Sequence, residues 1–238
     1  MRKISKIVKN PNFIPGIYNY CDSWCERCAY TSRCANFISG EERYSDMKDL
    51  DIRNEQFWKK LGDIFKNTFE LIYEKAEEYG IDLDNLDDEI DLPSMHNSDN
   101  QFLIKLCKKY EELTKSWFEE QHFGDLETVE KIEQKKTELE NVIEVIYWYQ
   151  YQIEVKFRRS FQGIDDNDFT SKHDMKGSAK VALIGIDRSL AAWNLLMHLI
   201  PLHEKEILQI ISILKKMKNV GERQFPNARS FVRPGFDE

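Results

Sequence analysis

The sequence is poor in the residues that make tight turns. It has only 10 Gly and 6 Pro among 238 residues, too few for the many turns of a β-sandwich or a β-barrel. It also has no apolar run near the roughly 18 residues that a membrane-spanning helix needs, so we expect no membrane contact. The basic start, MRKISKIVKNPNFIPG, has no apolar core followed by a small-residue cleavage site. We therefore expect no secretory signal and a cytoplasmic protein.

The sequence also lacks the short motifs of common enzyme classes. It contains no glycine-rich phosphate loop, no nucleophile elbow and no HExxH motif. A thiol mechanism would be expected in a thioredoxin-like βαβ context, which is missing here. The motifs therefore leave open whether the chain is an enzyme.

Charged residues are plentiful and mostly acidic. They make up 32% of the chain, hydrophobic residues make up 41%, and the net charge is −8. This balance is typical of a helical protein and disfavours nucleic acid as a partner of the whole surface. Basic residues gather near both ends of the chain: Arg2, Lys3, Lys6, Lys9, Lys215, Lys216, Lys218, Arg223, Arg229 and Arg233. They could form a patch for an acidic partner, and ordinary solvated surface is the simpler interpretation.

Helical periodicity dominates the rest of the chain. Phe57, Leu61 and Phe65, for example, belong to a series of apolar residues three or four positions apart that ends at Gly80. The same criteria predict five helices, at residues 54–79, 99–122, 125–161, 175–200 and 202–218. The second half of the third helix, VIEVIYWYQYQIEV, is almost entirely apolar, which indicates a position in the middle of a bundle.

These patterns predict an all-α protein, a bundle of about five helices with an N-terminal cysteine-rich, metal-binding cap. We expect the cap at residues 1–40, the bundle at residues 41–218 and a C-terminal tail at residues 219–238. The tail is expected either to dock over the bundle or to be disordered. Small residues recur between Gly177 and Ala192 and favour close packing of that helix.

Four of the five cysteines lie close together, in a C-x3-C-x2-C-x5-C arrangement: Cys21, Cys25, Cys28 and Cys34. Thiolates are soft ligands, and four in one loop suit Zn²⁺ or an iron–sulfur cluster. Disulfides are a third alternative, disfavoured in a reducing compartment. Structural zinc sites usually combine two separate pairs of ligands, whereas one short loop supplies all four here. The spacing therefore favours a [4Fe–4S] cluster with a redox, sensing or structural role and an unidentified redox or protein partner. A zinc-capped interaction module is the alternative.

The last three cysteines, spaced C-x2-C-x5-C, resemble the cluster loop of endonuclease III-type DNA glycosylases. The resemblance covers some 14 residues and implies a [4Fe–4S] cluster. The first spacing is six residues in that family and three here, and the glycosylase helix–hairpin–helix with its catalytic Lys and Asp has no counterpart. The DNA-repair activity is therefore not implied. The first three cysteines have the spacing of radical-SAM enzymes, but the α/β barrel of those enzymes is missing.

Aromatic and basic side chains accompany the cysteines. The aromatic residues are Tyr18, Tyr20, Trp24, Tyr30 and Phe37. They would either shield a cluster from water or pack the cap on the bundle. Arg27 and Arg33 could offset the negative charge of a thiolate-bound centre. Cys107, the fifth cysteine, is expected to be a small core residue.

A second candidate site consists of polar residues on otherwise apolar helix faces. Buried charges are costly unless they are paired or bind a metal. Four such residues could therefore form a metal or acid–base site: Glu144, Glu154, Asp187 and His198. The enzyme would be ferritin-like, although only one Glu-x-x-His pair, Glu119 and His122, is present. The alternative is a salt-bridge network that contains the pairs Glu154–Arg158 and Asp187–Arg188.

Overall fold

The fold is known from a computed structural model that describes residues 11–44, 98–119, 133–164 and 168–237, and positions 59, 62, 66, 70, 73, 74, 76 and 77. All regular structure in these ranges is helical, and they contain no strand. The prediction of an all-α protein is therefore confirmed. Among the described helices, none is both long enough and apolar enough to cross a membrane.

The chain divides into two compact units. The smaller unit consists of Met1–Phe13 and Thr31–Leu92, and the larger unit of Ile14–Tyr30 and Pro93–Glu238. The division therefore falls between Cys28 and Cys34, inside the segment that was predicted to form one cap ending at residue 40.

The smaller unit contains a short 3-10 turn, η3 (Thr31–Arg33), followed by helix α2 (Ala35–Tyr44). Arg33 donates from Nε to the carbonyl of Asn12 at 3.2 Å. Helix α2 continues through Gly40, because a glycine inside a helix costs only about 1 kcal/mol. The described positions between residues 59 and 77 are all helical, as expected for the predicted helix 54–79.

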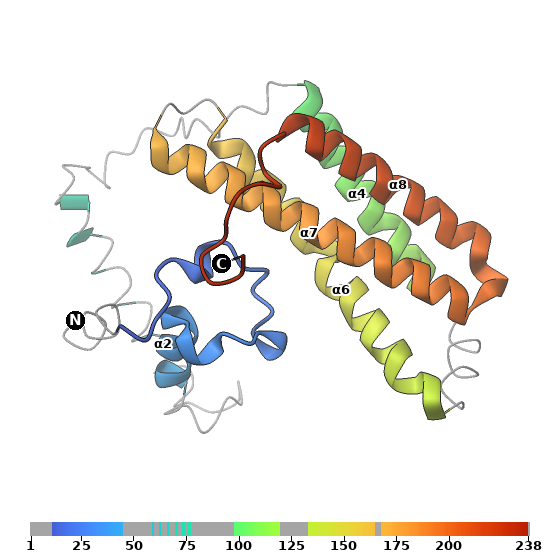
Figure 1. Ribbon diagram of the computed structural model, residues 1–238, viewed down its shortest axis with the longest axis horizontal. Coiled ribbons are helices and arrows are strands. Elements are labelled where there is room, and N and C mark those ends of the chain that lie inside the picture. Colours follow the sequence, from blue (N-terminus) through green and yellow to red (C-terminus); the bar gives the residue numbers. More distant parts are fainter. Residues whose placement is uncertain are drawn as a thin grey trace. The chain divides into compact units, whose positions relative to one another are not determined.

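The larger unit is a four-helix bundle made of α4 (Ser98–Glu119), α6 (Glu133–Gln162), α7 (Phe169–Leu199) and α8 (Glu204–Gln224) (Figure 1). Each helix packs against two others, in the order α4, α6, α7, α8 and back to α4. Helices α6 and α7 are antiparallel, since Arg159 pairs with Asp174 near one end and Tyr149 meets Arg188 farther along.

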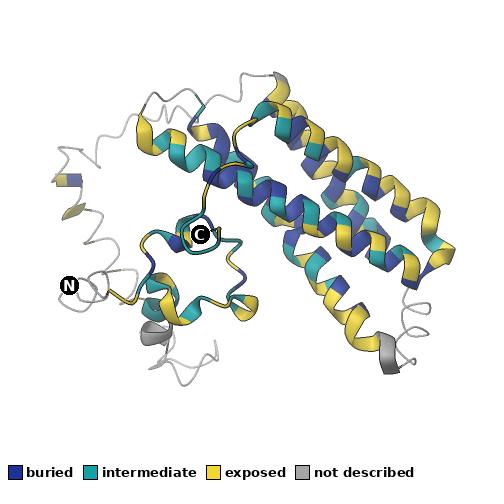
Figure 2. Ribbon diagram, in the orientation of Figure 1, coloured by how far each residue is buried: buried dark blue, intermediate teal, exposed yellow. Residues whose placement is uncertain are grey.

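Each of the four helices has buried residues along its length (Figure 2), and large apolar side chains fill the space between the helices. The fully buried ones include Leu103, Tyr110, Leu139, Ile146, Ile153, Phe157, Leu183, Ile186, Trp193 and Leu196. Burying one such side chain stabilises the fold by about 1.5–3 kcal/mol. The prediction that the second half of α6 is buried all round is wrong, since Tyr147, Tyr151 and Val155 are 50–60% exposed. Helices α4 and α7 are the neighbours of α6 in the bundle, and these three residues are not fully covered by any described part of the chain.

Two helices are longer than the sequence predicts. Helix α7 begins at Phe169 instead of residue 175, because the Asp168 side chain caps it and accepts the backbone N–H of Ser171 at 3.0 Å. Helix α8 ends at Gln224 instead of residue 218 and continues through Gly221. A Cβ at Gly221 would lie 2.9 Å from the Phe157 ring, so this glycine permits close packing inside the helix.

The C-terminal segment 225–237 is docked on the bundle, one of the two alternatives predicted for the tail. The ring of Phe231 lies 4.9 Å from that of Tyr20. Asp237 pairs with Lys180 of α7 at 2.8 Å and with Arg233 at 2.9 Å. Figure 1 shows this segment crossing α7, and these contacts connect it both to α7 and to residues 14–30.

Substitution of Gly177 tests the close packing of α7. A Cβ at this position would lie 2.2 Å from the Tyr20 ring, so the ring would have to move away from the helix. We expect Gly177→Ala to lower the free energy of unfolding by about 1–3 kcal/mol in chemical denaturation. Gly40→Ala is the matched control, because a Cβ there meets nothing within 4 Å. Equal destabilisation by both substitutions would contradict the close contact.

The C-terminal segment should respond to acid through Asp237. Hydrogen bonds from Arg233 and Lys180 lower the pKa of this carboxyl group against the opposing effect of burial. A lowered pKa stabilises the folded state above the unfolded pKa of about 4, and the stabilisation is lost as the pH falls toward the folded pKa. We expect Asp237→Asn to lower the free energy of unfolding by about 1–2 kcal/mol at pH 7 and by progressively less below about pH 4.

Glu112→Gln is the control for this titration. Glu112 pairs with Lys109 at 3.6 Å on the exposed face of α4, and such a surface pair contributes under about 1 kcal/mol. Unfolding followed by circular dichroism across the acid range measures both variants. A pH-independent difference between Asp237→Asn and the original chain would contradict the role of the ion pairs.

Candidate metal centre

Three of the four clustered cysteines lie on the segment Ile14–Tyr30 of the larger unit, which we call the cysteine loop. It contains two short 3-10 turns, η1 (Ile17–Asn19) and η2 (Cys25–Arg27). Cys21, Cys25, Cys28 and Cys34 are all partly exposed, and none of the chain's cysteines forms a disulfide. Cys34 belongs to the smaller unit, so its membership of a shared ligand set stays a prediction from the spacing.

Asp22 holds the cysteine loop on the bundle. Its backbone carbonyl accepts hydrogen bonds from Trp148 Nε1 and Gln152 Nε2, both at 3.0 Å. Its carboxylate accepts the Tyr149 hydroxyl at 2.6 Å and forms an ion pair with Arg188. The residue next to Cys21 is therefore bound to both α6 and α7.

The backbone after Asp22 is conformationally constrained. Ser23 has a φ of +60°, in the left-handed region that residues other than glycine rarely adopt. The carboxylate of Asp22 also accepts a hydrogen bond from the backbone N–H of Trp24 at 3.3 Å. This hydrogen bond connects the residues on either side of Ser23. Such a conformation costs about 1 kcal/mol or more, and the contacts of Asp22 and Trp24 hold it in place.

Trp24 is the second anchor of the loop. Its indole is buried and stacks on Trp148, with ring centroids 4.9 Å apart and an interplanar angle of 12°. The Arg27 guanidinium covers the Trp24 ring, with its carbon 4.9 Å from the centroid. Arg27 also pairs with Glu144 and donates to Asn141 at 2.7 Å. These contacts fix turn η2, which begins at Cys25.

The turn orients Cys25 and Cys28. Residues three apart in a 3-10 turn lie on the same side, and the Cys28 N–H donates to the Cys25 carbonyl at 3.1 Å. The backbone N–H of Tyr30 donates to Cys28 Sγ at 3.4 Å. The Cys21 thiol donates to the Tyr18 carbonyl at 3.4 Å.

Polar side chains from the bundle lie close to the start of the loop. Lys156 of α6 is buried, and burial lowers its pKa while the nearby Cys21 opposes this effect. The Tyr20 hydroxyl is 3.0 Å from His173 Nδ1. His173 lies on α7, which begins at Phe169. The one feature that could have marked Lys156 in advance is its position between the apolar residues Val155 and Phe157.

The cysteines do not form a ready-made metal cage. In the part of the chain that the structure describes, no three His, Cys, Asp or Glu side chains are grouped so that they could hold a metal ion. The ligand set Cys21, Cys25, Cys28 and Cys34 therefore rests on the chemistry of the thiols and on their spacing.

The four residues of the predicted second site take part in separate interactions. Glu144 pairs with Arg27 at the surface, and Glu154 pairs with Arg158 at 2.7 Å. Asp187 pairs with Lys218 at 2.8 Å and with Arg229 at 2.6 Å. His198 is exposed. The structure does not bring the four together, and the predicted partner of Glu119, His122, lies outside the described residues.

The salt-bridge alternative is right for one of its two predicted pairs. Glu154 and Arg158 do pair, one helical turn apart on α6. Asp187 and Arg188 do not pair with each other, because neighbouring helical residues point about 100° apart. Asp187 faces Lys218 of α8 and Arg229 of the C-terminal segment, and hydrogen bonds from these two residues lower its pKa against the opposing effect of burial. Arg188 faces the cysteine loop and pairs with Asp22.

The aromatic residues near the cysteines mainly pack the loop on the bundle. Tyr20 and Trp24 are buried, whereas Tyr18 is 44% exposed. The ring of Tyr30 lies 5.2 Å from that of Phe236 in the C-terminal segment. Phe37 is partly buried in α2 of the smaller unit. Cys107 is buried in the bundle core, as predicted, and burial raises the pKa of its thiol.

Several basic residues of the predicted patch are already paired. Lys218 and Arg229 bind Asp187, and Arg233 binds Asp237. Lys215, Lys216 and Arg223 are exposed on α8. The four basic residues of the N-terminus, at positions 2–9, lie outside the described residues. The pairing of three members with acids weakens the case for a strong basic surface.

Comparison with protein-family models, with curated proteins and with solved structures found no match to this chain. The local resemblance of the cysteine spacing to endonuclease III-type glycosylases therefore stays a prediction.

Asp22→Ala tests how the cysteine loop is held. The substitution removes the acceptor of Tyr149, Trp24 and Arg188 and leaves a partly buried guanidinium without its carboxylate. We expect the amide hydrogens of residues 20–30 to exchange at least about tenfold faster, measured by hydrogen-exchange mass spectrometry. The free energy of unfolding should fall by about 1–3 kcal/mol.

Glu26→Ala is the matched control, since it removes an exposed carboxylate from turn η2 of the same loop. It should leave the exchange of residues 20–30 unchanged. Protection of this segment that survives in Asp22→Ala would show that the loop is held by other contacts.

Proposed function

We propose that this protein binds a [4Fe–4S] cluster through Cys21, Cys25, Cys28 and Cys34 and uses it for electron transfer or redox sensing. The observation that carries the proposal is a run of four partly exposed cysteines without a disulfide, three of them on a loop bound firmly to the helical bundle. Soft thiolate donors in this number suit an iron–sulfur cluster.

The surroundings of the sulfur atoms support a negatively charged centre. Four thiolates carry more negative charge than the iron–sulfide core of the cluster neutralises, so nearby cations and N–H donors are favourable. Lys156 is close enough to Cys21 to interact with it electrostatically. The Tyr30 N–H donates to Cys28 Sγ.

Partial exposure of the thiols favours a redox or sensing role. A structural metal is normally enclosed by its ligands and shielded from solvent, whereas electrons pass readily only to a centre near the surface. The same donor set can hold Zn²⁺, in which case the loop would be a zinc-capped module. Cysteines that must remain reduced belong in a reducing compartment, and we therefore propose a cytoplasmic location.

Metal analysis of protein purified without oxygen tests the proposal. We expect a brown protein with about four iron and four sulfide ions per chain. Changing any one of Cys21, Cys25, Cys28 or Cys34 to Ser should lower the iron content by more than about half, because an alcohol is a poor ligand for iron. Iron, zinc and acid-labile sulfide are measured on the same samples.

Cys107→Ala is the matched control, since Cys107 is buried in the bundle core and should leave the iron content unchanged. One zinc ion per chain with no sulfide would overturn the iron–sulfur assignment in favour of the zinc-capped module. Protein that holds neither metal after anaerobic purification and reconstitution would overturn the metal proposal as a whole.

A further inference from the structure

A cleft of about 1060 Å³ lies in the larger unit between α6, α7, the cysteine loop and the end of the C-terminal segment. We call it the loop cleft. Its size is that of a site for a small organic molecule. Cys28 lines it, so a ligand in the loop cleft would lie beside one of the proposed metal ligands.

One part of the cleft wall is apolar. Helix α6 contributes Val142 and Val145, and helix α7 contributes Ala192 and Leu195. The rings of Tyr30 and Phe236, which contact each other edge to face at 5.2 Å, also line the cleft. An apolar wall with aromatic groups binds the hydrocarbon or aromatic body of a ligand by excluding water.

Two arginines line the same cleft, Arg27 from the loop and Arg188 from α7. Within the described ranges, Arg188 donates two hydrogen bonds, both from Nη1. Arg27 also donates two, both from Nη2. A guanidinium has five N–H donors, so each arginine keeps donors that make no hydrogen bond to the described residues. Planar guanidinium donors bind the oxygen atoms of carboxylate, sulfonate or phosphate groups in pairs.

The two carboxylates of the cleft do not cancel this preference. Asp22 is already bonded to Arg188, Tyr149 and the Trp24 backbone. Glu138 is exposed and lies on α6, where water screens its charge. Glu144 pairs with Arg27 and does not line the cleft, so the charged hydrogen-bond donors left for a ligand in the cleft are those of the two guanidinium groups.

We propose that the loop cleft binds a small amphipathic anion, with its apolar or aromatic body against α6 and α7 and its acidic head group on Arg27 and Arg188. The inference does not rest on the metal proposal, because the walls and both arginines belong to the protein itself. Where the metal centre is present, the ligand lies next to it.

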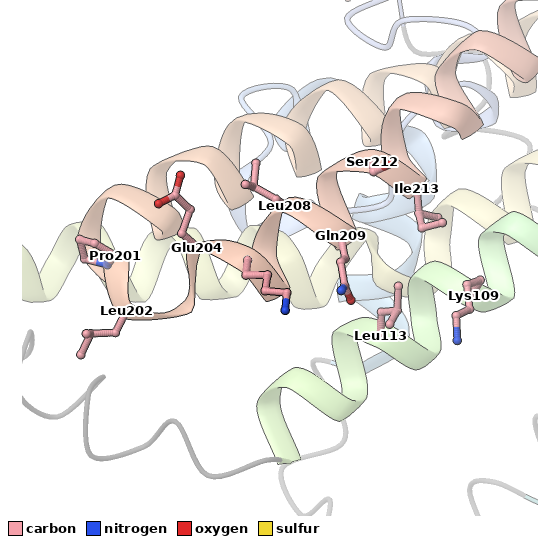
Figure 3. A pocket seen from close by; sticks show the side chains of 10 residues that line it. Lys109, Leu113, Pro201, Leu202, Glu204, Leu208, Gln209, Ser212 and Ile213 are labelled. Carbon is pink, nitrogen blue, oxygen red and sulfur yellow. The ribbon is translucent and has the colours of Figure 1, made fainter.

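A second groove on the larger unit lacks the combination of an apolar wall and arginines that characterises the loop cleft. It has a volume of about 900 Å³ and lies between α4 and α8, where Leu113, Leu202, Leu208 and Ile213 line it (Figure 3). Its charged residues are Lys109, Lys205 and Glu204, and it contains no arginine. This groove serves as the internal comparison for the experiment.

The test uses the fluorescent dye 8-anilinonaphthalene-1-sulfonate, an aromatic body with an anionic head, on the folded full-length chain. Ala191 lines the loop cleft and is exposed, so Ala191→Trp fills the cleft without removing a contact of the loop. We expect this variant to weaken dye binding at least about tenfold. Arg27→Gln should weaken it about fivefold or more through loss of one charged hydrogen bond.

Competition experiments distinguish the contribution of the acidic head group to binding from that of the apolar body. Octanoate, which has a carboxylate and an apolar chain, should displace the dye. Octyl phosphate does so more strongly if the two arginines prefer a phosphate head, and less strongly if they prefer a carboxylate. Inorganic phosphate alone should not displace the dye at similar concentration, because it lacks the apolar body.

Two matched variants control for site and fold. Asn194→Trp places the same side chain on an exposed position of α7 outside the cleft and should leave dye binding unchanged, as should Leu208→Ser in the other groove. Near-ultraviolet circular dichroism verifies that each variant is folded. The proposal is overturned if the folded protein does not bind the dye, if Ala191→Trp binds it as tightly as the original chain, or if Leu208→Ser alone removes binding.

Discussion

The position of the cysteine loop on the bundle depends on the hydrogen bonds of one residue, Asp22. Its carbonyl and carboxylate accept donors from two helices that are already packed together, α6 and α7. Because the donors are fixed relative to each other, the loop can leave the bundle only by breaking several bonds at once. The Asp22 side chain is 21% exposed, so removing its cationic partner leaves a partly buried charge. The free energy lost in this way is larger than the stabilisation that the intact ion pair provides. Cys21 directly precedes Asp22 in the sequence, so the contacts of Asp22 also determine where Cys21 lies.

The contacts on either side of Asp22 make the cysteine loop a part of the bundle rather than a separate cap. Before the anchor, the Tyr20 ring occupies the space over Gly177 of α7, where any Cβ would overlap with it. After the anchor, Trp24 stacks on Trp148 of α6. The C-terminal segment then closes over the loop through Phe231 and Phe236. Residues 20–30 of the loop therefore contact α6, α7 and the C-terminal segment directly.

The sequence was sufficient to predict the helices, but it could not predict the contacts between the cysteine loop and the bundle. Apolar spacing of three or four residues reports which face of a helix is buried, so the bundle and the core position of Cys107 were predictable. Asp22 is one of 42 acidic residues, and its partners Tyr149 and Arg188 lie 127 and 166 positions away, so no local pattern marks it. The predicted second site failed to assemble for a geometric reason. Glu144 and Glu154 are ten residues apart on α6, and at about 100° per residue they point to different sides of the helix.

Turn η2 connects the metal proposal with the loop cleft. In a 3-10 turn, residues three apart share a side, while the residues between them point about 120° away. Cys25 and Cys28 are therefore presented together, and Arg27 is directed elsewhere, onto the Trp24 ring and toward Glu144 of α6. In the two proposals, the same few residues provide two thiols for a metal and one guanidinium for an anion, and Cys28 lies in the wall of the cleft. Because Trp24 and Asp22 hold this turn rigidly, a ligand that moves Arg27 must also strain the turn that carries the thiols. Anion binding and the metal centre are for this reason expected to be coupled through the backbone, without any larger rearrangement of the bundle.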